Sequence, residues 1–233
     1  ISMSRNFDVM GTQKHIVVVL GMHRSGTSAL TRALKVMGVE LGTNLLPPMP
    51  GVNEKGFWED VDINALNIEL LGVLGHDWHT LSPIFAEDLE SSALSDMKLK
   101  AIDVLRKKLA STQCFGMKDP RMARLLPFWQ SVFSHINAHT SYVISCRNPM
   151  SVARSLTARD GFALEKGYLL WQEHMLNSLT WTENCPRLVV DYDCFLDDPV
   201  KEMNRISQSL GLSFNPKGAD FLEFEGEFLE RAL

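Results

Sequence analysis

The stretch HIVVVLGMHRSGTSALTRALKVMG, residues 15–38, decides the fold of this chain. It predicts a buried strand over residues 16–20, a glycine-bracketed turn over residues 21–26, and a helix that begins at Thr27. The first N–H groups of a helix lack backbone partners and carry partial positive charge, and glycines let the preceding turn close around an anion. Arg24 adds a full positive charge to the turn. The stretch therefore predicts a phosphate-binding loop.

The residue pattern of this loop differs from that of ATP- and GTP-hydrolysing proteins. Their loop reads G-x-x-x-x-G-K-[ST], and its lysine reaches the outer phosphates. Gly21, Gly26 and Ser28 keep this spacing, but Thr27 replaces the lysine. A cation lies inside the loop instead, at Arg24. We therefore expect a loop that holds phosphate but does not belong to an ordinary nucleoside triphosphatase.

Length and composition indicate one α/β domain over residues 1–233. Of the 233 residues, 45% are hydrophobic, which is enough for one sizeable core. A formal net charge of −5 argues against a nucleic-acid-binding protein with a general basic surface. We expect residues 1–14 to be a tag remnant or a disordered N-terminus, with Met3 as the native start.

The cysteines and the hydropathy pattern bear on the compartment. None of the four cysteines shows C-x-x-C or zinc-ligand spacing, which favours free thiols in a reducing compartment. No apolar run approaches the ~20 residues of a membrane-spanning helix. No signal peptide is visible either. We expect a cytoplasmic protein without a membrane segment.

Apolar strands alternate with amphipathic helices along the rest of the chain. The predicted strands are residues 16–20, 114–117, 141–146 and 187–191. The predicted helices after the first are residues 60–72, 91–110, 122–133, 149–158, 164–183, 199–210 and 221–229. This order predicts a three-layer P-loop-like α/β fold, with a central, mainly parallel sheet and helices on both faces. Such sheets bind ligands at the carboxyl ends of their strands, which precede Gly21–Ser28, Lys118–Arg121, Arg147 and Asp191–Tyr192.

A second candidate phosphate site lies in SYVISCRNPMSVARSL, residues 141–156. An apolar strand ends at Arg147, Pro149 begins a helix, and Ser155 follows within that helix. An arginine at a strand end and a serine on the next helix can converge on one phosphate. Taken alone, the pattern leaves open that Arg147 pairs with a carboxylate and that Ser155 is an ordinary helix serine.

The two motifs together resemble the sulfotransferase superfamily, whose donor is 3′-phosphoadenosine 5′-phosphosulfate (PAPS). In that family a [KR]-x-G-T-[ST] loop holds the 5′-phosphosulfate, and a strand ending in R-[DN]-P with a later serine holds the 3′-phosphate. The residues that match the first motif are Arg24, Ser25, Gly26, Thr27 and Ser28. Those that match the second are Arg147, Asn148, Pro149 and Ser155. The resemblance implies PAPS as donor, adenosine 3′,5′-bisphosphate (PAP) as product, and no metal.

Further stretches extend the resemblance over most of the chain. Residues 190–193 and 197–199 look like a variant of the family's Y-E-D-L-like stretch. Residues 56–60 and 118–121 look like features of its bacterial and carbohydrate-type branches. Arg24 stands where many members carry lysine, and an arginine is a poor proton donor. This departure disfavours a mechanism in which the loop cation donates a proton.

Glu59 is the favoured general base for the acceptor. The resemblance places a catalytic glutamate between the phosphate loop and the next helix, and Trp58 offers an apolar wall that would raise the pKa of Glu59. Arg24 and Lys118 are the candidate catalytic cations, beside the leaving group and the sulfate. Glu59 as a helix-capping charge remains an alternative, and the other candidate bases are Glu54, Asp60, Asp62 and His76. Of these, Asp60 and Asp62 are better interpreted as the cap and a first-turn charge of the helix over residues 60–72.

The acceptor is expected to be a small molecule or a glycan with a hydroxyl or amine group, and no nucleic acid. The loops over residues 42–58 and 75–86 are the candidate acceptor-binding segments. His76 and His79 have no third metal ligand in the pattern, which favours a role without metal. Two other functions stay open: a small-molecule kinase, favoured by the strand 188–191 that ends in an aspartate, and a non-catalytic nucleotide-binding protein.

Overall fold

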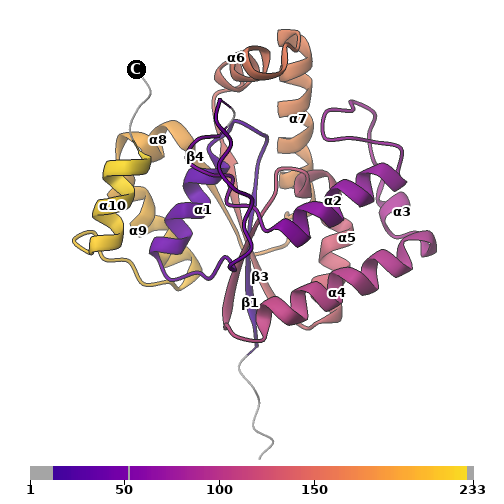
Figure 1. The fold of residues 1–233 in the computed structure, drawn as a ribbon, viewed down its shortest axis with the longest axis horizontal. Helices are drawn as coiled ribbons and strands as arrows, with labels where there is room; N and C mark the ends of the chain where they lie inside the picture. The colour runs from indigo at the N-terminus through magenta and orange to yellow at the C-terminus, as the bar shows by residue number, and fades with distance from the viewer. Residues whose placement is uncertain (1–12, 52, 230–233) are drawn as a thin grey trace, which may run out of the picture.

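The structure is a computed structural model that describes residues 13–51 and 53–229 (Figure 1). Its sheet consists of parallel strands in the order β2-β1-β3-β4. The strands are β1 (His15–Leu20), β2 (Cys114–Lys118), β3 (His139–Cys146) and β4 (Arg187–Asp191). The apolar run of β1 is buried because the strand has a neighbour on each side and helices on both faces. All four carboxyl ends therefore meet at one edge of the sheet.

Helices cover both faces of the sheet (Figure 1). Alternate side chains of β1 pack into different core clusters, with Ile16 and Val18 on one face and Val17 and Val19 on the other. The first face is covered by α2 (Val61–Val73), α4 (Ser95–Leu109), α5 (Met122–His135) and α7 (Leu164–Trp181). The second is covered by α1 (Thr27–Val36), α9 (Pro199–Leu210) and α10 (Ala219–Phe228). The predicted three-layer α/β fold is confirmed.

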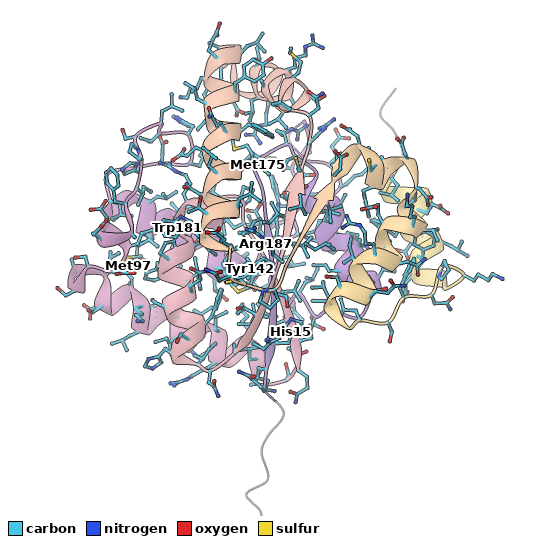
Figure 2. All side chains as sticks on the ribbon, turned by 180° about the vertical axis from the view of Figure 1, so that it is seen from behind. His15, Met97, Tyr142, Met175, Trp181 and Arg187 are labelled. Carbon is cyan, nitrogen blue, oxygen red and sulfur yellow. The ribbon has the colours of Figure 1, made fainter. Side chains whose placement is uncertain are left out.

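Large side chains of α5, α7 and β3 fill the first layer (Figure 2). Met175 of α7 and Tyr142 of β3 belong to one core cluster, and Trp181 packs against it. Gln130 Nε2 of α5 donates to the Trp181 carbonyl at 2.8 Å and to the Tyr142 hydroxyl at 3.4 Å. These contacts hold α5 and α7 in fixed positions against β3.

Local signals set the helix starts as predicted. The Asp60 side chain accepts two backbone N–H groups at the start of α2. Pro149 lies in the first turn of α6 (Pro149–Asp160), and the Asn148 side chain caps that helix. The capping interpretation of Asp60 is therefore confirmed.

Some element boundaries differ from the sequence-based expectation. Residues 91–110 form a 3-10 turn (Ser92–Leu94) followed by α4, instead of one helix. The structure also contains two short helices, α3 (Ala86–Leu89) and α8 (Tyr192–Asp197). Each has fewer residues than two helical turns, so apolar periodicity does not reveal it.

The start of the described chain is held by the segments that precede β2 and β3. Gln13 Nε2 donates to the Asn137 carbonyl at 3.0 Å, and Lys14 Nζ donates to the Thr112 carbonyl at 2.8 Å. Residues 1–12, most of the segment expected to be a tag remnant or disordered, lie outside the described residues.

Two further observations concern the cysteines and the helices. All four cysteines are free thiols. Within residues 13–51 and 53–229, no helix is long and apolar enough to cross a membrane.

Candidate active site

The loop between β1 and α1 needs glycine at two positions. A Cβ atom at Gly21 would lie 2.9 Å from the Ser145 carbonyl oxygen, and one at Gly26 would lie 2.1 Å from the Tyr192 ring. Gly26 also has a φ of 91°, which disfavours any residue with a Cβ. Ser145 Oγ of β3 donates to the Ser25 carbonyl at 2.6 Å. The neighbouring strand therefore fixes the shape of the loop.

The N-terminus of α1 is available to an anion. Its N-cap residue is Gly26, so no side chain caps the helix, and its first turn has no acidic residue. Gly26, Thr27 and Ser28 line a pocket. Unpaired N–H groups and the positive end of the helix dipole stabilise a bound phosphate or sulfate group.

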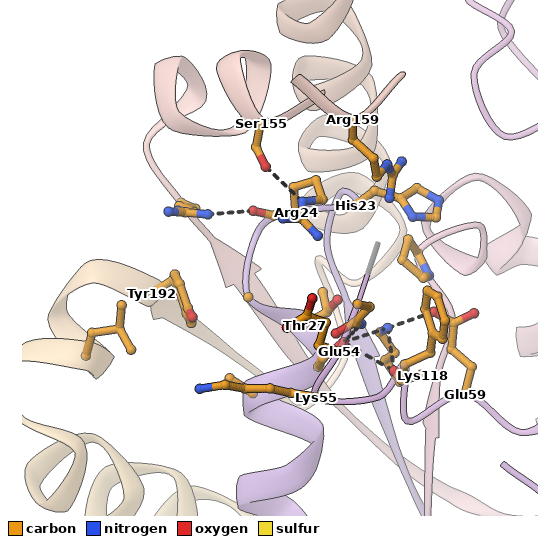
Figure 3. A pocket seen from close by; sticks show the side chains of 18 of the residues that line it. His23, Arg24, Thr27, Glu54, Lys55, Glu59, Lys118, Ser155, Arg159 and Tyr192 are labelled. Carbon is orange, nitrogen blue, oxygen red and sulfur yellow. Dashed lines mark hydrogen bonds and ion pairs between the residues drawn. The ribbon is translucent and has the colours of Figure 1, made fainter. Parts of the chain in front are cut away.

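Arginine side chains gather beside this helix end. Arg24 Nε donates to Ser155 Oγ at 2.8 Å, and Arg147 Nη1 donates to the Arg24 carbonyl at 2.9 Å (Figure 3). The Arg147 guanidinium lies 5.2 Å from the centre of the Tyr192 ring, and its Nε is buried without a hydrogen-bond partner among the described residues. Burial lowers the pKa of Arg24, and the charges of Arg159 and Arg147 lower it further. A bound polyanion would relieve this repulsion.

A buried ion pair lies near the first turn of α1 as well. Lys118 Nζ lies 2.7 Å from Glu59 Oε1, and it donates to the Phe57 carbonyl at 2.8 Å and to Ser28 Oγ at 3.3 Å (Figure 3). The exposed fractions of the Lys118 and Glu59 side chains are 3% and 4%. Burial raises the pKa of Glu59, and the Lys118 charge opposes that rise. The pair combines a cation with a carboxylate that can accept a proton.

A buried hydrogen-bond network fixes the position of the Glu59 carboxylate. Asn64 Nδ2 donates to Glu59 Oε2 at 2.9 Å and to Asp119 Oδ2 at 3.3 Å. Asn67 Nδ2 donates to Asp119 Oδ2 at 3.0 Å, and Asn67 Oδ1 accepts from Trp129 Nε1 at 2.8 Å. Neither asparagine is among the residues predicted from the sequence. Their signal is two amides, three residues apart, on the otherwise apolar face of α2.

One pocket of about 770 Å³ joins the arginine cluster and the ion pair (Figure 3). This volume lies within the usual range for a site that binds a small ligand. The predicted site residues that line it are Arg24, Gly26, Thr27, Ser28, Glu59, Lys118, Arg147 and Ser155. Ser25 is buried beneath the loop, where its hydroxyl donates to the Met22 carbonyl at 2.5 Å.

The alternative bases take other places. Glu54 lines the same pocket, so geometry keeps it as a candidate. Asp60 caps α2, and Lys108 Nζ lies 2.6 Å from a carboxylate oxygen of Asp60 and 2.6 Å from one of Asp62. The His76 ring lies 3.4 Å from a guanidinium of α5. The surroundings of Asp60 and Asp62 are those of helix-capping and surface charges.

The direction of the pKa shift of Glu59 is as predicted, but its main cause is general burial. The Trp58 ring also contacts cations of α1: Lys35 Nζ lies 5.3 Å and Arg32 Cζ 5.5 Å from its ring. The Trp58 ring thus packs against an apolar cluster and against two cations, and its effect on the pKa of Glu59 stays a prediction.

The metal and kinase interpretations rest on residues that have other partners. His79 Nε2 lies 3.3 Å from an Asp77 carboxylate oxygen. The described residues include no group of three or more histidine, cysteine, aspartate or glutamate side chains that could hold a metal ion. Asp191 caps α8 by accepting from the Cys194 N–H at 2.9 Å.

Fold and site together define an α/β protein whose phosphate loop faces an arginine–serine group and a lysine–glutamate pair. Residues 17–216 match the family model described as "Sulfotransferase family". The chain belongs to the sulfotransferase family and is a transferase by that membership.

Solved structures show the same fold. The sulfotransferase domain from the Synechococcus PCC 7002 olefin synthase is 18% identical, with a TM-score of 0.53 over 93% of this chain and 82% of that chain. The sulfotransferase domain from the curacin biosynthetic pathway is 15% identical, with a TM-score of 0.55 over 92% of this chain and 78% of that chain. Identities this low establish similarity of fold alone. No curated protein matches the chain.

Proposed function

We infer that this protein transfers a sulfuryl group from PAPS to a hydroxyl or amine acceptor, with PAP as the product. The observation that carries this inference is the placement of two cationic groups around one helix N-terminus in a single pocket. The arginine–serine group suits one phosphate, and the helix end with Lys118 suits a second anionic group. PAPS carries both a 3′-phosphate and a 5′-phosphosulfate.

Two features of the pocket fit this donor. Arg147 has a buried Nε without a partner among the described residues, which a phosphate oxygen would satisfy. A Cβ at residue 26 would meet the Tyr192 ring, so the loop needs glycine there, and glycine lets backbone N–H groups approach an anion directly. Arg147 and Ser155 would hold the 3′-phosphate, and residues 24–28 would hold the 5′-phosphosulfate. The bound donor would supply the sulfuryl group.

The ion pair would carry the chemistry on the acceptor side. Glu59 would take the proton of the acceptor, and its raised pKa makes it a stronger base than an exposed glutamate. Lys118 and Arg24 would stabilise negative charge as it develops in the transition state. Arg24 would remain protonated throughout, because a guanidinium gives up its proton too reluctantly to act as an acid.

The acceptor class is part of the proposal. A small molecule or a glycan fits a pocket of about 770 Å³ beside a long loop, with carbohydrate as the first choice. A net charge of −5 disfavours nucleic acid as partner or acceptor. Four free thiols suit a reducing compartment, and we place the protein in the cytoplasm.

The first test compares two nucleotides on one variant. Arg147→Ala should lower the affinity for PAP by ~10–100-fold, because one charge-assisted contact to the 3′-phosphate is lost. Its affinity for AMP, which lacks that phosphate, should change by less than about threefold. Isothermal titration calorimetry measures both constants.

The matched control is Arg154→Ala, at an exposed arginine of α6 outside the pocket lining. It should bind PAP like the wild type. Equal losses for PAP and AMP in Arg147→Ala would point to a disturbed loop, since Arg147 also holds the Arg24 carbonyl. Unchanged PAP affinity would contradict the assignment of the 3′-phosphate site.

The second test is transfer itself, with [³⁵S]PAPS and a panel of N-acetylglucosamine, glucosamine, 4-nitrophenol and 1-octanol. A labelled product identifies the acceptor class. Thermal shifts separate the alternatives: a sulfotransferase is stabilised by PAP without magnesium, and a kinase only by ATP with magnesium. PAP binding without transfer to any acceptor of a wider panel would favour a non-catalytic protein.

A further inference from the structure

Arg124 is a charged residue at the centre of the molecule that the proposed chemistry does not use. It lies in the first turn of α5, and its side chain has an exposed fraction of 0%. Its Nε donates to Glu173 Oε1 of α7 at 3.0 Å. A buried guanidinium is costly unless its donors are satisfied. The other partners of Arg124 therefore indicate which part of the chain it holds in place.

Those partners lie on the segment of residues 76–82, within the loop that follows α2. Arg124 Nη1 donates to the Asp77 carbonyl at 3.0 Å, and Nη2 donates to the Ser82 carbonyl at 2.7 Å. Nη2 also lies 3.4 Å from His76 Nδ1. One rigid, planar group thus holds both ends of the segment and links them to α7.

The held segment carries Trp78, which backs one wall of the pocket. The Trp78 ring centre lies 4.6 Å from that of His23 and 5.2 Å from the Arg159 guanidinium. His23 and Arg159 both line the pocket, and Figure 3 shows them on the side away from Tyr192. Trp78 also packs against the cluster of Met22, Val152, Leu156 and Leu170. A shift of Trp78 would therefore act first on His23 and Arg159, the two of its described neighbours that line the pocket.

We propose that Arg124 is a positioning residue for the acceptor: it clamps residues 76–82 so that Trp78 holds His23 and Arg159 in place. This inference rests on the proposed function, because it assigns that wall to the acceptor half of the site. Arg124 acts through the segment and does not touch the reacting atoms. Arg147 and Ser155 are held by hydrogen bonds to the backbone and side chain of Arg24, which do not involve Trp78.

The test uses the full chain with Arg124→Met, and with Arg106→Met at an exposed arginine of α4 as the matched control. In Arg124→Met, hydrogen exchange in residues 76–82 should become faster, while the Kd for PAP stays within about threefold of wild type. With the best acceptor of the panel named above, the acceptor KM should rise on the order of tenfold or more. The kcat should change much less, because Arg124 does not touch the reacting atoms. A merely destabilised fold would instead lower activity at every acceptor concentration.

Trp78→Leu provides a second route if Arg124→Met does not fold. It removes the ring and keeps the buried guanidinium, and it should raise the acceptor KM in the same way. Three results would each overturn the inference: unchanged hydrogen exchange in Arg124→Met, an unchanged acceptor KM in Trp78→Leu, or a Kd for PAP that rises as much as the acceptor KM in either variant. Absence of transfer by the wild-type protein would instead count against the proposed function, and the exchange result would still decide whether Arg124 clamps the segment.

Discussion

At the scale of single residues, Glu59 has neighbours with opposite effects on its charge. Burial favours the neutral carboxylic acid, and Lys118 at 2.7 Å favours the carboxylate. Asn64 adds a donor to the second oxygen, which also favours the carboxylate. The net result is a raised pKa for a group that still has a cation beside it.

This balance predicts the behaviour of Glu59→Gln. The variant should bind PAP with little change and lose ~10²-fold or more of its transfer rate, because the amide cannot take a proton. The wild-type kcat should fall as the pH is lowered through a pKa above that of an ordinary glutamate, since only the carboxylate acts as a base. Initial rates from pH 4.5 to 8 measure this acid limb.

Glu54→Gln is the control, because Glu54 lines the same pocket. It should keep both the rate and the acid limb. The opposite pattern, full activity in Glu59→Gln and a lost limb in Glu54→Gln, would transfer the role of base to Glu54.

Some site residues are predicted from the sequence because their role depends on local backbone, whereas Arg147 and Ser155 follow from the family resemblance. Gly21, Gly26 and Pro149 follow from turn and helix-start chemistry, and Asp60 follows from capping. The role of Arg124 is not predicted, because its partners lie 42 to 49 residues away and no local pattern indicates them. Long-range partners of buried polar groups depend on packing that one sequence does not reveal.

At the scale of elements, the phosphate loop depends on α8 as well as on β1 and α1. Tyr192 is the first residue of α8, and its ring occupies the space where a Cβ of residue 26 would lie. From the sequence, Tyr192 is predicted to lie at a strand end and in a family-like stretch, but no contact with the phosphate loop is predicted. A helix of six residues has too little periodicity to be predicted, and its contact with the loop spans most of the chain.

Gly26→Ala should therefore lower stability and PAP binding more than a glycine substitution in an open turn. Gly38→Ala is the matched control, because Gly38 also has a positive φ, 85°, but a Cβ there would meet nothing within 4 Å. We expect Gly38→Ala to cost about 1 kcal/mol of stability and to keep PAP binding. Gly26→Ala should lose more stability and abolish PAP binding, as measured by urea unfolding and calorimetry. Normal PAP binding in Gly26→Ala would show that the Tyr192 ring can leave the loop.

At the scale of the whole molecule, buried histidines make stability depend on pH. Burial lowers the pKa of His174 from 6.5 to about 4, and the Arg124 charge acts in the same direction. His23 is lowered as well, by burial and by nearby cations that include Arg121 and Arg159. Both imidazoles are therefore neutral in the folded protein at pH values where the unfolded chain binds protons.

The sign of the effect follows from linkage. Between pH 6.5 and 4 the unfolded state binds more protons than the folded state, so the free energy of unfolding falls as the pH falls. The pKa shift of His174 corresponds to about 3 kcal/mol over that window.

Urea unfolding at pH 7.5, 6 and 5 measures this loss of stability. His174→Gln should flatten the dependence, and His135→Gln, at an exposed side chain, should retain the wild-type slope. Identical slopes in all three proteins would contradict this origin.

The order of the strands also has a consequence for synthesis of the chain. The phosphate loop leaves the ribosome before β3 does, because Ser145, which holds the Ser25 carbonyl, follows 120 residues later. At about 5–20 residues per second, translation takes about 6–24 s to cover that interval. During that time the nascent chain carries the sequence of the phosphate loop without the strand that fixes its shape. Nascent chains that end before Ser145 should therefore acquire no affinity for nucleotide, however complete the motif is in their sequence.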